Sequence, residues 1–233
     1  MQGSTLTREA DSTLLLRAGI EVGVASTKAF TSQLVCLNLL ALLLGRMRHV
    51  SKESGQELIR ALLALSQQVE TILQKKEEIK ALAHKYASYK NVFFIGRQQM
   101  FPVALEGALK LKEISYINAN GYPAGEIKHG PIALIDEETL VIALCGNHMT
   151  YEKITSNIME LKARKAHVLA ITSDFDRDIG DIADDVIYLP ETLDELSAIT
   201  TSVATQLFSY YVADILGANI DQPRNLAKSV TVE

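Results

Sequence analysis

The stretch Val92-Phe-Phe-Ile-Gly96 decides the fold, because it is a short apolar run that ends at a glycine. Short apolar runs of this kind are typical of β-strands that are buried on both faces. The same pattern recurs three times further along the chain, at Leu140-Val-Ile-Ala-Leu-Cys145, His167-Val-Leu-Ala-Ile-Thr172 and Val186-Ile-Tyr-Leu189. We therefore expect four of these runs to form strands of one sheet.

Segments with helical spacing of apolar residues lie between and after these runs. The spacing predicts helices over about residues 103–117, 151–165 and 195–216. Apolar strands joined by helical connections imply right-handed crossovers and a parallel sheet covered on both faces. The sequence thus predicts an α/β fold, a three-layer αβα sandwich with four or five parallel strands between residues 90 and 189.

The first ninety residues have the apolar spacing of helices throughout. We expect a long helix over residues 28–47, with Ser26 or Thr27 as its cap. Further helices are expected over 53–66 and 69–86. The chain begins with turn-forming residues and no preceding strand, which suggests that it starts inside a domain.

Composition excludes several classes of partner. The chain has 233 residues, 48% of them hydrophobic, and a net charge of −5 without any basic run, so we expect neither nucleic acid nor a membrane surface as a partner. The most apolar stretch, residues 34–44, is shorter than the roughly twenty residues that span a bilayer, so we expect a core helix there. No export signal is visible at the N-terminus, and we expect a cytoplasmic protein.

Neither cysteine points to a metal or a redox centre. Cys36 and Cys145 both lie in apolar stretches, without CxxC spacing or a matching histidine cluster. We interpret both as buried thiols in a reducing compartment. The sequence therefore predicts no metal and no cofactor.

The helix around residues 103–117 carries a charged stripe. Glu106, Lys110 and Glu113 are spaced by four and three residues, which at about 100° per residue places them within roughly 60° of arc. Two carboxylates and an ammonium on one stripe are compatible with acid/base catalysis. The alternative is a set of solvated ion pairs on an exposed helix face, each worth about 0.2–0.5 kcal/mol.

The segment that follows favours the catalytic interpretation. Tyr122-Pro-Ala-Gly-Glu-Ile-Lys-His-Gly-Pro131 is punctuated by glycine and proline and carries Glu126, Lys128 and His129. Loops next to a rigid helix often present catalytic groups. The ordinary pKa of a histidine side chain, near 6.5, suits proton shuttling by His129, although a lone loop histidine is also compatible with a simple surface role.

Three longer motifs carry a family resemblance: Glu21-Val-Gly-Val-Ala-Ser-Thr-Lys28, Gly125-Glu-Ile-Lys-His-Gly-Pro131 and Asp221-Gln-Pro-Arg-Asn-Leu-Ala-Lys-Ser-Val-Thr-Val-Glu233. Together with the charged helix, they make the chain resemble, over its whole length, the isomerase half of the glucosamine-6-phosphate synthases, which are glutamine:fructose-6-phosphate amidotransferases. That half contains two sugar isomerase (SIS) domains. The resemblance implies that residues 1–85 are the helical end of the first SIS domain, 86–218 the complete second domain and 219–233 a functional tail.

The resemblance also assigns roles to residues. It implies that Lys228 forms a Schiff base with the sugar, that Glu113 moves a proton between C1 and C2, and that Lys110 and Glu106 orient Glu113 and manage nearby hydroxyl protons. His129 would open the sugar ring from the neighbouring subunit, which implies a homodimer. Without the motif, Lys228 would be interpreted as a solvated lysine in a frayed terminus.

Val24, Ser26 and Ala227 match positions that contact the sugar in this family, and for Ser26 a helix cap is the competing or coexisting role. The implied partners are fructose 6-phosphate, glucosamine 6-phosphate and a glutaminase domain of the same chain. Both that domain and the family's phosphate-binding loop, Ser-Gln-Ser-Gly-Glu-Thr, are missing from this sequence. We therefore expect these 233 residues alone to bind substrate poorly and to be inactive.

Two other functions are compatible with the same fold. A phosphosugar isomerase or deglycase would use the charged stripe but would have no need of an ammonia route or of the tail. A sugar-phosphate-sensing regulatory module would need neither Lys228 nor the Glu113 and His129 pair. The tail motif favours the synthase.

Overall fold

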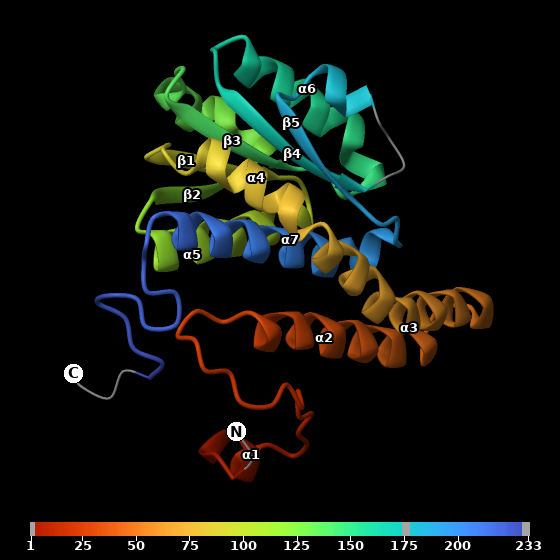
Figure 1. The fold of residues 1–233 in the computed structure, drawn as a ribbon. Helices are drawn as coiled ribbons and strands as arrows, with labels where there is room; N and C mark the ends of the chain where they lie inside the picture. The colour runs from red at the N-terminus through yellow and green to blue at the C-terminus, as the bar shows by residue number, and fades with distance from the viewer. Residues whose placement is uncertain (1–2, 174–177, 230–233) are drawn as a thin grey trace.

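The computed structural model describes residues 3–173 and 178–229 and contains one parallel five-stranded sheet (Figure 1). Its strands lie in the order β2-β1-β3-β4-β5. Their bounds are Asn91–Gly96 for β1, Asn118–Pro123 for β2, Thr139–Leu144 for β3, His167–Ser173 for β4 and Asp185–Leu189 for β5. The expected α/β sandwich is thereby confirmed, since the strands alternate with helices that cover both faces.

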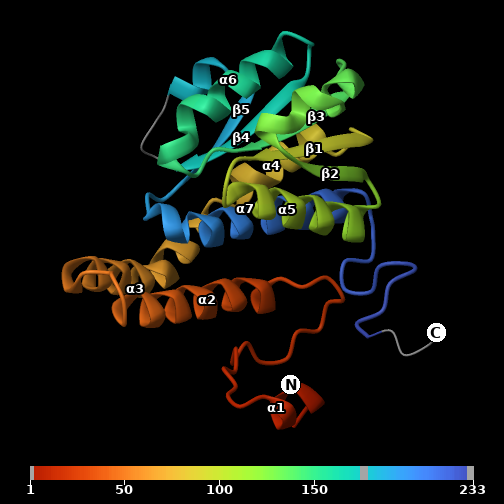
Figure 2. The ribbon, with the colours of Figure 1, turned by 180° about the vertical axis from the view of Figure 1, so that it is seen from behind.

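The two faces of the sheet are covered by different helices (Figures 1 and 2). Helices α4 (Lys76–Tyr86), α5 (Met100–Ser115) and α7 (Asp194–Ile215) pack on one face, and α6 (Tyr151–Lys162) with the 3-10 helix η1 (Ala124–His129) covers the other. Strand residues alternate between the two cores: Phe94 packs with the α5 and α7 face, and Phe93 with the α6 face. This alternation follows from the two-residue period of a strand.

Strand β2 is the strand whose position the sequence did not reveal. The sequence pattern predicts no strand there and places Tyr122 at the start of a Gly/Pro-rich loop, yet Asn118–Pro123 pairs in parallel with β1 at the sheet edge. Glycine is needed within it, because a Cβ at Gly121 would lie 2.8 Å from the backbone of Leu105 on α5. Its polar composition is tolerated because an edge strand pairs on one side only.

The N-terminal part is helical, as expected, with differences in detail. Helices α1 (Thr5–Glu9), α2 (Lys28–Arg46) and α3 (Lys52–Gln74) precede α4, and the break between α3 and α4 falls at Lys75 instead of near residue 67. In Figure 1, α2 and α3 extend below the sandwich, under α7.

The expectation that residues 34–44 form a core helix is wrong for the described chain. None of the nineteen residues of α2 is buried, although Leu34 and Val35 pack against Leu65, Leu196 and Ile199. By length and composition alone, α2 is also apolar enough to cross a membrane. Its outer face carries Leu37, Leu40 and Leu43, all more than two-fifths exposed.

Candidate active site

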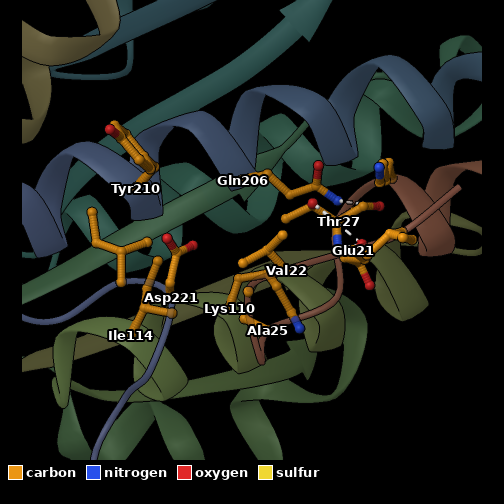
Figure 3. Close-up of a pocket in the computed structure, with 13 residues that line it drawn as sticks. Glu21, Val22, Ala25, Thr27, Lys110, Ile114, Gln206, Tyr210 and Asp221 are labelled. Atoms are coloured by element: carbon orange, nitrogen blue, oxygen red, sulfur yellow. Dashed lines mark hydrogen bonds between the residues drawn. The ribbon is translucent and has the colours of Figure 1, made fainter. Parts of the chain in front are cut away.

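A cavity of about 360 Å³ lies where α5 and α7 meet the segment before α2 and the start of the C-terminal tail (Figure 3). The segment before α2 supplies one wall, α5 and α7 supply the second, and the tail supplies the third. The lining residues are Ile20, Glu21, Val22, Gly23, Ala25, Thr27, Lys28, Lys110, Ile114, Gln206, Tyr210, Ile220 and Asp221.

The charged stripe of α5 borders this cavity through Lys110. The Lys110 Nζ atom lies 2.7 Å from Glu113 Oε2 and 3.5 Å from Glu106 Oε1. The lysine side chain is only 4% exposed, and those of Glu106 and Glu113 are 13% and 21% exposed. These groups are therefore not solvated charges on an open helix face. An ammonium that bridges two half-buried carboxylates is an arrangement suited to proton transfer.

The two carboxylates of the stripe differ in environment. Burial raises the pKa of the Glu106 carboxyl, Lys110 opposes that rise, and the negative charge of Glu113 adds to it. Lys110 donates its hydrogen bond to Glu113 instead, at 2.7 Å. Glu113 is therefore the carboxylate that is hydrogen-bonded to the ammonium, and Glu106 is the one whose pKa burial raises.

Lys228 is held by Glu21 and by the backbone of the same segment. Its Nζ atom donates to Glu21 Oε2 at 2.8 Å, to the Gly23 carbonyl at 2.8 Å and to the Val24 carbonyl at 3.5 Å. Partial burial alone would raise the pKa of the Glu21 carboxyl, but the hydrogen bonds from Lys228 and from two backbone N–H groups outweigh it and lower the pKa to about 2.

Glu21 also accepts hydrogen bonds at the start of α2, where Ser26 or Thr27 was expected to act as the helix cap. Thr27 is the N-cap residue of α2, yet its side chain makes no cap hydrogen bond. Instead, Glu21 Oε1 accepts from the backbone N–H groups of Thr27, at 2.9 Å, and Ala29, at 3.2 Å. Thr27 thus occupies the expected N-cap position, but a carboxylate six residues upstream, and not its own side chain, accepts the hydrogen bonds of the helix start. The sequence analysis assigned no role to Glu21. The signal that could have indicated one is its place as the acidic first residue of the 21–28 motif.

The tail docks through several contacts before it reaches Lys228. The Arg224 guanidinium lies 4.1 Å from the centroid of the Tyr116 ring, and the Arg224 N–H donates to Tyr116 Oη at 2.9 Å. Val24 N–H donates to the Asp221 carbonyl at 2.9 Å, and Pro223 is buried. The last part of the tail motif, residues 230–233, lies outside the described residues.

The remaining expected site residues are more dispersed. His129 ends η1, its side chain is 65% exposed, and its nearest acidic partner is Glu126 at 3.7 Å. It does not line the cavity of this chain. Val24 contributes backbone groups beside the cavity, Ser26 is half-buried, and Ala227 is exposed next to Lys228. The structure therefore brings together Lys110, Glu113 and Glu106, and separately Lys228 with Val24, but leaves His129 apart.

Comparison with known proteins agrees with this architecture. A family model described as the SIS domain matches residues 85–215. A glutamine–fructose-6-phosphate aminotransferase [isomerizing] of Chlorobaculum tepidum is 50% identical over 231 residues, and one of Thermus thermophilus is 50% identical over 233. These matches cover 99% and 100% of this chain but only 38% and 39% of those proteins.

A solved structure of a related protein also matches this chain. The C-terminal domain of the glucosamine-fructose-6-phosphate aminotransferase from Francisella tularensis superposes with a TM-score of 0.90 at 34% identity, over 95% of this chain and 63% of that one. The chain thus spans about two-fifths of the length of the curated relatives. The chain belongs to the SIS-domain family, and along its whole length it corresponds to the C-terminal isomerase half of the glutamine–fructose-6-phosphate aminotransferases.

Proposed function

We propose that this chain is the isomerase part of a cytoplasmic, homodimeric enzyme that converts fructose 6-phosphate and glutamine-derived ammonia into glucosamine 6-phosphate. One observation carries the proposal: Lys110, which bridges the carboxylates of Glu106 and Glu113, lines the same cavity as Glu21, which holds Lys228. A carboxylate for proton transfer and an amine for imine formation are the two groups that this conversion needs.

The proposed reaction begins with the open-chain ketose. The amine of Lys228 attacks C2, and water leaves as the C2=N bond forms. Ammonia then adds at C2 and the bond to Lys228 breaks, which regenerates the lysine and leaves C2=NH. Glu113 takes a proton from C1, and a proton returns to C2, while the C1 hydroxyl proton ends on nitrogen. The product is a 2-amino aldose.

Other residues serve this sequence of steps. Lys110 would orient Glu113 through the 2.7 Å hydrogen bond. Glu106 would exchange protons with nearby sugar hydroxyls. His129 would open the ring in the partner subunit, which suits its exposed position at the end of η1. Val24, Ser26 and Ala227 would contact the sugar, and a glutaminase domain would deliver ammonia. Without the Ser-Gln-Ser-Gly-Glu-Thr phosphate loop, the 233 residues alone bind substrate poorly and do not turn it over.

The lysine assignment is tested in a chimera in which this chain replaces the matching 231 residues of the Chlorobaculum tepidum relative. Borohydride reduction with fructose 6-phosphate should leave an adduct on Lys228, located by mass spectrometry. A Lys228→Arg control keeps the charge and should give no adduct. An adduct on another lysine would overturn the assignment, and no adduct in an active chimera would favour a phosphosugar isomerase that works without a Schiff base.

The proton-transfer assignment uses the same chimera. Glu113→Gln should abolish exchange of the C1 hydrogen with solvent deuterium, while fructose 6-phosphate affinity stays within about tenfold, because the amide keeps the shape but cannot accept the proton. Glu152→Gln, on the exposed side of α6, is the matched control. Exchange that persists in Glu113→Gln would remove Glu113 from this role.

The shared-site assignment is tested by subunit mixing. His129→Ala and Lys228→Ala chimeras should each be inactive, and mixing them under conditions of proven subunit exchange should restore part of the activity. Restoration is expected because some mixed dimers then carry one site with both native residues. An absence of rescue would show that His129 and Lys228 act within one subunit or not together.

A further inference from the structure

We propose that Glu21 is the positioning residue of Lys228: its carboxylate ties the start of α2 to the ammonium and holds the tail lysine beside the cavity in an unreactive form until substrate displaces it. This inference rests on the proposed function of Lys228, but its test needs no sugar. Glu21 lies outside the residues assigned above to catalysis or substrate contact.

The hydrogen bonds around Lys228 fit an ammonium. A protonated lysine has three N–H donors and no acceptor. Three oxygens surround the Lys228 Nζ atom, namely Glu21 Oε2 and the carbonyls of Gly23 and Val24. With a donor directed at each oxygen, no lone pair is left to attack a carbonyl carbon. The contact therefore stores the lysine near its place of action, and attack requires that it leave Glu21 and lose a proton to water.

Glu21 is itself fixed more firmly than an ordinary surface carboxylate. Its second oxygen accepts two backbone N–H groups at the start of α2, where the unpaired N–H groups and the helix dipole favour negative charge. The side chain of Glu21 is 13% exposed, whereas that of Lys228 is 46% exposed. The carboxylate is thus the rigid half of the pair and the lysine the movable half.

The position of the pair suggests how substrate releases the lysine. Gly23 and Val24 provide two of the three acceptors, and they belong to the turn that leads into α2 and lines the cavity. A sugar hydroxyl that binds these carbonyls competes directly with Lys228 for them. Loss of two acceptors leaves the lysine with the Glu21 contact alone, so occupancy of the cavity weakens the contacts that hold the amine.

The test measures how fast Lys228 reacts in the 233-residue chain itself. Competitive acetylation with limiting acetic anhydride is followed by mass spectrometry, with exposed Lys52 as the internal reference. Glu21→Gln keeps an oxygen for Thr27 and Ala29 but removes the charge that faces Lys228. We expect Lys228 to react about fivefold faster relative to Lys52 in this variant, the size of a partly exposed charged hydrogen bond.

The control separates this contact from a general loss of negative charge. Asp221→Asn removes a carboxylate from the same cavity, while the Val24 hydrogen bond goes to the Asp221 backbone and persists. Lys228 should react at the wild-type rate in this variant. An unchanged rate in Glu21→Gln, or an equal increase in Asp221→Asn, would overturn the inference.

A spectroscopic readout distinguishes positioning from a purely structural role. In proton–nitrogen NMR, the held Lys228 ammonium should give a cross-peak with slowed solvent exchange, which Glu21→Gln should lose and Glu21→Asp should partly restore. Loss of the signal in all variants together with unfolding of α2 would show a structural role only. Failure of the borohydride trap in the chimera, with these results intact, would refute the Schiff base and leave the Glu21 contact standing.

Discussion

The SIS-domain region and the α2 helix differ sharply in burial although both are rich in apolar residues. All six residues of β3 are buried, between a core that includes α5 and α7 and a second core that includes α6. None of the nineteen residues of α2 is buried, and its Leu37 and Leu43 are 60% and 59% exposed. An apolar sequence thus predicts a surface that burial would stabilise. Whether that surface is buried depends on a second layer of helices or strands that packs against it.

The candidate active site lies at the seam between these two regions. The packed SIS region supplies Lys110 and Glu113 on α5, and the exposed N-terminal region supplies Glu21. The tail adds Lys228 from the other end of the chain. We therefore expect substitutions to lower the free energy of unfolding most in the core, less at the seam and least on the exposed helix.

The largest effect is expected in the core. Phe94 is fully buried, and its ring would lie 2.8 Å from a Cβ on Gly107, so α5 packs directly on it. Phe94→Ala removes that packing and should lower the free energy of unfolding by about 3–5 kcal/mol. Urea denaturation followed by circular dichroism measures it. A loss below about 1 kcal/mol would mean that the sheet region relaxes as easily as the exposed helices.

The second effect is expected at the seam. Lys110→Met removes the ammonium between Glu106 and Glu113 and leaves two half-buried carboxylates side by side. We expect a loss of about 2 kcal/mol at pH 7, less than for a fully buried pair because both carboxylates keep some solvent.

The pH dependence of this loss gives a second check. Because the pKa of Glu106 is raised in the folded chain, its contribution to stability is full below its ordinary value of 4.5 and is lost as the pH rises. Lys110→Met should therefore cost less at pH 4 than at pH 7 in urea denaturation. An equal cost at both values would show that lost packing of the lysine stem, and not charge, explains the effect.

The sequence revealed the core better than the seam, for a physical reason. Strands β1, β3, β4 and β5 have unbroken apolar runs, and the stripe of α5 has helical spacing, so local pattern sufficed for both. Strand β2 is polar and lies at the edge, where local pattern gives no apolar signal. Glu21 acts through Lys228, which lies 207 residues away in the sequence. Contacts of that range have no local signature.

Whether the first SIS domain ends at residue 85 stays a prediction, as do the role of 219–233 as a separate tail and the roles given to the site residues. The prediction of a core helix over residues 34–44 failed for the same reason that strand β2 and the contact between Glu21 and Lys228 were missed. The apolar spacing of residues 34–44 predicted a face to be buried, but spacing alone does not say which segment covers that face.

A smaller effect is expected from the acid titration of Glu21. Its pKa is lowered from 4.5 to about 2, so its contribution to stability is present above pH 4.5 and is lost as the pH falls toward 2. Glu21→Gln should remove that part of the acid dependence. The difference at neutral pH should be less than about 1 kcal/mol, since Lys228 is 46% exposed and solvent screens the pair. Urea denaturation between pH 2.5 and 6 measures it, and parallel curves for the two proteins would contradict the assignment.

The smallest effect is expected on the outer face of α2. Leu43 is 59% exposed, and glutamine is nearly as good a helix former, so Leu43→Gln should change the free energy of unfolding by less than about 0.5 kcal/mol. Leu65, which is 6% exposed on α3, provides the matched control, and Leu65→Gln should cost several times more because it buries an amide. If Leu43→Gln instead costs more than about 1 kcal/mol and sedimentation shows a lower mass than the wild type, a second copy covers this face in solution. The difference in burial between the SIS-domain region and α2 would then hold for a single chain and not for the protein in solution.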